Sequence, residues 1–73
     1  MNKDIAAKVM DQLVQCHEAI DAAEVIAWEI NDPEERDVIR KALAEASGHL
    51  YTEAMMSLIS QYPDLNPYPR SKQ

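Results

Sequence analysis

Residues 31–35 read Asn-Asp-Pro-Glu-Glu, and this stretch divides the chain into two long segments. An Asp before a Pro is typical of a helix start, because the carboxylate caps the first free N–H groups and Pro suits the first helical position. Asp32 and Glu35 also have the spacing of a capping box. We therefore predict that one helix ends near Ile30 and that the next begins near Pro33. A connection this short makes the two helices antiparallel neighbours.

The segment before the turn has a regular apolar pattern and contains neither Gly nor Pro. Its apolar residues recur at gaps of three and four, which is typical of a heptad seam. We predict a helix over about residues 3–30, with Ile5, Ala19 and Ile26 widening one flank of its seam. One column of the seam is Ala6, Leu13, Ile20 and Ala27, and the other is Val9, Cys16, Ala23 and Ile30.

The segment after the turn predicts a second helix over about residues 33–61, which Pro63 ends. Gly48 is its weak point, because Gly costs about 1 kcal/mol against Ala inside a helix. The sequence leaves open one continuous helix, a bend at Gly48 or a break at Ser47-Gly48. The predicted core face is Ile39, Leu43, Ala46, Leu50, Ala54 and Leu58.

Residues 63–73 form the predicted tail, whose prolines do not allow an α-helix. We expect this Pro-rich tail to be extended or polyproline-like up to Pro69 and disordered beyond it. The hairpin is then residues 1–62, and the predicted fold class is all-α.

The length and the net charge of the chain argue against several classes of function. A chain of 73 residues is one domain, and its net charge of −6 disfavours binding to a phosphate backbone or to anionic lipid. Cys16 is the only cysteine, which excludes a disulfide within the chain and suits a reducing compartment. The chain has no run of roughly 20 apolar residues and no apolar run behind its start. We expect no signal peptide, no membrane contact and a cytoplasmic location.

Surplus apolar residues predict a partner. Val14, Val25 and Trp28 lie off the predicted seam, and a lone hairpin has no second surface to cover them. Pairing two hairpins into a homodimeric four-helix bundle, or a higher oligomer, covers such residues. The alternative is a monomer whose tail folds back over them. The candidate interaction residues are Val25, Trp28, Met55, Met56, Ile59, Tyr62, Leu65 and Tyr68.

The end of the chain has a specific predicted place in that dimer. If the hairpins run antiparallel to each other, the turn of one lies beside the open end of its mate. We therefore expect the segment around Tyr62 to Tyr68 to pack near Trp28 of the partner chain. The turn itself is predicted to depend on the Asp32 cap, whose loss costs about 1 kcal/mol.

A metal site is one alternative. His17 and Asp21, and likewise His49 and Glu53, are spaced i,i+4. The two histidines fall at a similar height on facing helices, which is how metal sites in bundles are built. The Glu-x-x-His spacing of diiron bundles and the His-Glu-x-x-His motif are both absent, so a half-buried His17 bonded to Asp21 is the favoured interpretation. Cys16 is interpreted as a buried thiol, and no cofactor is expected.

A nucleic-acid-binding patch is another alternative, since Arg36, Arg40 and Lys41 form the only basic cluster. Neighbouring acids offset it, so a solvated mixed-charge face is favoured. Gly48 is the only glycine, which excludes a glycine-rich phosphate loop, and no catalytic constellation is present. The favoured hypothesis is a small acidic homo-oligomeric module without catalysis that binds itself and another protein.

Overall fold

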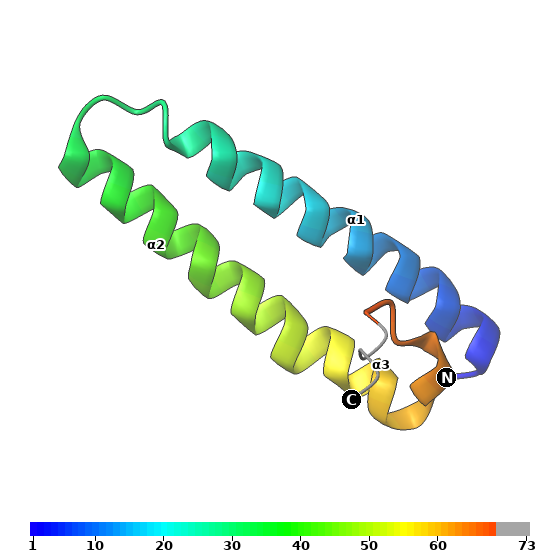
Figure 1. Ribbon diagram of the computed structural model, residues 1–73. Coiled ribbons are helices and arrows are strands. Elements are labelled where there is room, and N and C mark those ends of the chain that lie inside the picture. Colours follow the sequence, from blue (N-terminus) through cyan, green and yellow to red (C-terminus); the bar gives the residue numbers. More distant parts are fainter. Residues whose placement is uncertain (69–73) are drawn as a thin grey trace, which may run out of the picture.

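The computed structural model describes residues 1–68, and all the regular secondary structure in that part of the chain is helical. It is an all-α helical hairpin, with the turn at one end and the N-terminus beside the last helix at the other (Figure 1). Its elements are α1 (Lys3–Ala27), α2 (Pro33–His49), the π-helical η1 (Leu50–Met55), α3 (Met56–Gln61) and the 3-10 turn η2 (Pro63–Leu65). The predicted disorder beyond Pro69 lies outside the described residues.

Side-chain caps start both long helices. The Asn2 carboxamide oxygen accepts from the Ile5 N–H at 2.9 Å, and an Asp32 carboxylate oxygen accepts from the Glu35 N–H at 3.2 Å. Each cap satisfies an N–H group that has no partner inside its helix. The turn sequence therefore acts as a helix start, and α2 begins at Pro33.

The first helix ends at Ala27, earlier than the predicted end near Ile30. The residues after it make tighter i to i−3 bonds, such as the Ile30 N–H to the Ala27 carbonyl at 3.0 Å. The Arg36 guanidinium then donates to the Ile30 carbonyl at 3.2 Å. The connection is longer than predicted because these bonds satisfy the backbone without a further α-helical turn.

The inner seam of α1 differs from the prediction in one column. The column Ala6, Leu13, Ile20 and Ala27 is at least half-buried, but Val9 and Cys16 of the other column are exposed. The second inward column is instead Met10, His17 and Glu24. Gaps of four and three persist, so the helix is turned about its axis relative to the predicted face.

The second long helix is turned in the same sense. Ile39 and Ala46 of the predicted core face are exposed, whereas Arg36, Arg40 and Ser47 are half-buried. The helical backbone is unbroken after Gly48 but widens to η1, where the Met56 N–H bonds to the Tyr51 carbonyl, five residues back. The extra residue in that turn brings Met55 to the core beside Leu58.

Residues 62–68, which we call the returning segment, follow α3 and fold back on the chain. The Tyr62 hydroxyl donates to the Met1 carbonyl at 2.7 Å, and Lys3 forms an ion pair with Asp64. The hydrogen bond from Lys3 is the main cause that lowers the pKa of Asp64 below its usual value, and the positive charge of Lys3 adds to it. Pro63–Leu65 is a 3-10 turn, so the prediction of an extended or polyproline-like tail is wrong at its start.

The core is small and lies at the open end. Its main cluster is Ala6, Met10, Met55 and Leu58, with Leu65 and Tyr62 of the returning segment packed against it. The molecule measures 46 × 31 × 16 Å, so the helices form a single layer. Most domains cover each helix on two sides by stacking layers. One layer with a small core leaves a broad surface of both helices uncovered.

Candidate interaction surface

The uncovered surface carries apolar side chains from both long helices and the turn. We call it the apolar face and define it by Ile5, Val9, Cys16, Ile26, Ile30, Val38, Ile39, Ala42 and Ala46. Helical periodicity puts Ile5, Val9 and Cys16 on one side of α1 and Ile39, Ala42 and Ala46 on one side of α2, because these residues are spaced by three, four or seven. Ile26 and Val38, at the outer margins of the face, are 61% and 67% exposed. Gathered exposed apolar side chains are typical of interaction surfaces, so this face is the candidate.

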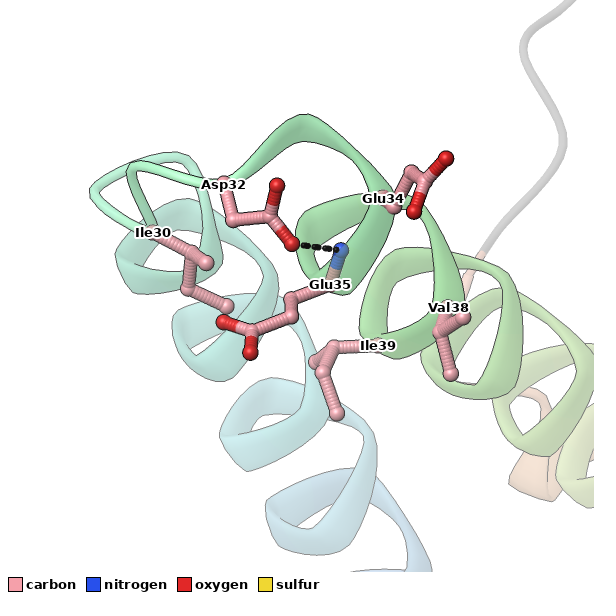
Figure 2. A pocket seen from close by; sticks show the side chains of 6 residues that line it. All are labelled: Ile30, Asp32, Glu34, Glu35, Val38 and Ile39. Atoms are coloured by element: carbon pink, nitrogen blue, oxygen red, sulfur yellow. Dashed lines mark hydrogen bonds between the residues drawn. The ribbon is translucent and has the colours of Figure 1, made fainter.

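One hollow of the apolar face lies at the turn end. Ile30 comes from the connection, and Val38 and Ile39 come from the first turns of α2 (Figure 2). Asp32, Glu34 and Glu35 form the rest of its lining. An apolar centre with an acidic margin attracts an apolar surface that carries positive charge.

A second hollow lies midway along the hairpin. Cys16 and Ile20 line it from α1, and Ala42, Ala46 and Leu50 line it from the other side. Most of these side chains are small, so the backbones of α1 and α2 can be approached closely there. Glu45 and His49 complete the lining.

The opposite face is occupied by the chain's own groups near the turn. The guanidinium groups of Arg40 and Arg36 lie over the Trp28 ring, 4.1 and 5.4 Å from its centre. Arg40 also pairs with Glu24 at 3.2 Å. Of the predicted nucleic-acid patch, both arginines therefore have partners within the chain, and Lys41 is exposed.

The middle of that face holds a polar cluster around His17. Its Nε2 lies 2.7 Å from the Ser47 hydroxyl, and its Nδ1 lies 2.9 Å from the Tyr68 hydroxyl. The Tyr68 ring also lies near Tyr51, at 6.3 Å between ring centres. Partial burial, followed by the negative charges of Asp21 and Glu18, raises the pKa of Tyr68. These contacts hold the returning segment against α1.

The four candidate metal ligands are not brought together. Both ring nitrogens of His17 are engaged by hydroxyl groups, and His49 lines the hollow on the other side of the hairpin. Helical periodicity places Asp21 with His17 and Glu53 with the apolar face. No group of three or more metal-ligating side chains occurs within residues 1–68.

The predicted interaction residues divide between core and surface. Met55 is fully buried, so its assignment to an interaction surface is wrong. Ile59, Tyr62 and Leu65 pack on the chain's own core, and Met56 is half-buried. Val25, Trp28 and Tyr68 are exposed, at 70%, 56% and 40%.

Sequence reasoning missed most of the apolar face. The sequence pattern predicts Ile5 and Ile26 on a flank of the first seam, but it predicts Val9, Cys16 and Ile39 in the core. That flank is the signal in the sequence that points to the apolar face. Apolar residues that extend beyond one seam indicate a helix with contacts on two sides. On α1 these residues include Val9 and Cys16, which belong to the predicted inner column but face outward.

Comparison of the chain with protein-family models, curated proteins and solved structures finds no match. Across residues 1–68, no helix combines the length and the apolar character that crossing a bilayer requires.

Proposed function

We propose that this chain is a non-catalytic protein-interaction module that acts as a homodimer, with two hairpins joined through their apolar faces into a four-helix bundle. The observation that carries the proposal is the apolar face itself, which spans both long helices and is left uncovered by the returning segment. A second hairpin supplies the layer that a single helical layer lacks.

The module's remaining surface is acidic and suits a basic protein partner. The net charge is −6, and Asp4, Asp11 and Glu18 of α1 are among the exposed acids. The lone thiol supports a reducing compartment such as the cytoplasm. In this function the dimer binds a basic protein through its acidic surface and modulates that protein.

A pair of alanines provides the test of self-association. Ala46 and Ala44 lie in the same helix and are both exposed, but Ala46 lines the hollow on the apolar face and Ala44 lies on the opposite side with Arg40 and Lys41. Light scattering at micromolar concentration should give twice the chain mass for the wild type and for Ala44→Glu. Ala46→Glu should give the monomer mass, because it buries an unpaired charge.

Two outcomes contradict the proposal. One is a wild-type monomer with a cooperative melt, which shows that the hairpin is stable without a second chain. The other is an equal effect of the two alanine substitutions, which shows that the apolar face is not the interface. Far-ultraviolet circular dichroism of both variants confirms that each remains helical.

A further inference from the structure

We infer that the two copies pair antiparallel, so that the turn of each hairpin lies over the open end of its mate, with the two-fold axis through the hollow of Cys16, Ala42 and Ala46. This inference rests on the proposed homodimer. It adds which residues meet, and it places the open end of the mate over the turn-end hollow.

Charge selects the antiparallel arrangement over the parallel one. Glu29, Asp32, Glu34 and Glu35 are exposed at the turn end, where three of them surround or border the turn-end hollow. A parallel pair would bring these carboxylates against their own copies, and like charges face to face cost free energy.

The open end carries no such excess of acid. Lys3 and Lys8 lie there with Asp4 and Asp64, and Lys3 is paired with Asp64. An antiparallel pair places this balanced end over the acidic turn of the mate, so that the turn carboxylates do not meet their own copies. The same arrangement puts the exposed side chain of Ile5 beside the mate's turn end, where Ile26 is exposed.

The position of the axis follows from the lengths of the helices. Cys16 lies at the middle of α1 (Lys3–Ala27), and Ala46 lies midway along the continuous helical backbone of residues 33–61. Full overlap of two antiparallel hairpins therefore puts the axis at their height. The small side chains there let the backbones approach, and α1 then faces its own copy with Cys16 next to the mate's Cys16.

The first test uses a charge effect. In the antiparallel dimer the carboxylates of Glu34 and Glu35 do not face their copies, so Glu34→Gln with Glu35→Gln should leave the dimer dissociation constant within about two-fold of the wild type at low salt. In a parallel dimer the same change removes repulsion, so the constant should fall. Asp11→Asn with Glu18→Gln, on the outer side of α1, is the control for the change in net charge.

The second test uses the native thiol. Mild oxidation of the wild-type dimer should form a disulfide between the two Cys16 side chains, because only the antiparallel arrangement brings their Cα atoms near bonding distance. A Cys16→Ser, Ala22→Cys variant is the control, since Ala22 is exposed on the outer side of α1 and should remain unlinked. Non-reducing gel electrophoresis separates the products.

The outcomes distinguish the antiparallel pairing from the homodimer itself. A wild-type dimer that tightens on Glu34→Gln with Glu35→Gln, or that forms no Cys16 disulfide, overturns the antiparallel pairing and leaves the homodimer standing. A monomeric wild type overturns both and leaves the apolar face to a different protein.

Discussion

The guanidinium carbon of Arg40 lies 4.1 Å from the centre of the Trp28 ring, and the same group pairs with Glu24. Trp28 is therefore exposed at its edge but covered on its face by the chain's own cation. The predicted contact between Trp28 and the partner's segment 62–68 stays untested. In this structure both already have partners within one chain, at opposite ends of the hairpin.

Removing the cation should uncover the ring. We expect Arg40→Ala to lower the free energy of unfolding by about 1 kcal/mol, since a cation–π contact and a partly exposed ion pair are both lost. Trp28 fluorescence should shift to the red as water reaches the ring. Lys41→Ala is the control, because that side chain is exposed and next in sequence. Equal emission from both variants would show that the Arg40–Trp28 contact does not form in solution.

Two adjacent methionines test the position of the core. Met55 is fully buried, whereas Met56 is only half-buried. Met55→Ala should cost about 2–5 kcal/mol by leaving a cavity, and Met56→Ala should cost clearly less. Urea unfolding followed by circular dichroism measures both. A larger effect at Met56 would mean that the π turn of residues 50–55 is absent and the register after it is different.

Gly48 offers a stabilising change. It lies within a helix without positive φ, and a Cβ added there meets no atom within 4 Å. Gly48→Ala should therefore raise the free energy of unfolding by about 1 kcal/mol through the loss of backbone freedom in the unfolded chain. A destabilised variant, measured by the urea midpoint, would instead show that the glycine is needed for the widened turn that follows.

Alkaline pH should weaken the contact between the returning segment and α1. Because the pKa of Tyr68 is raised in the folded chain above its ordinary 10.0, the neutral form is the one that the fold favours. The stabilisation is fully present below pH 10 and is lost as the pH rises through the raised pKa. Nuclear magnetic resonance of the Val14 and Leu65 methyl groups should report the release. Tyr68→Phe should abolish this pH dependence, and its persistence would assign it to another group.

The sequence by itself determined the all-α class, the position of the turn and the existence of surplus apolar surface. Local physics is sufficient for these features. Asp32 and Pro33 specify a helix start through a cap and a fixed φ, and apolar gaps of three and four specify helices on either side. The sequence gives a tail that folds back on its own chain only as an alternative to the dimer, because prolines limit the backbone without showing where a segment packs.

Only the tertiary structure decided which side of each helix faces inward. The apolar arc of α1 is wider than one seam, so Val9 and Cys16 fit the pattern as well as Met10 does. The choice depends on contacts between residues far apart in sequence, such as His17 with Ser47 and Glu24 with Arg40. Those polar pairs bond to each other inside the seam, and Leu65 packs against the core at the open end. Periodicity carries no information about such partners, and so the column that it assigns to the core forms the open apolar face instead.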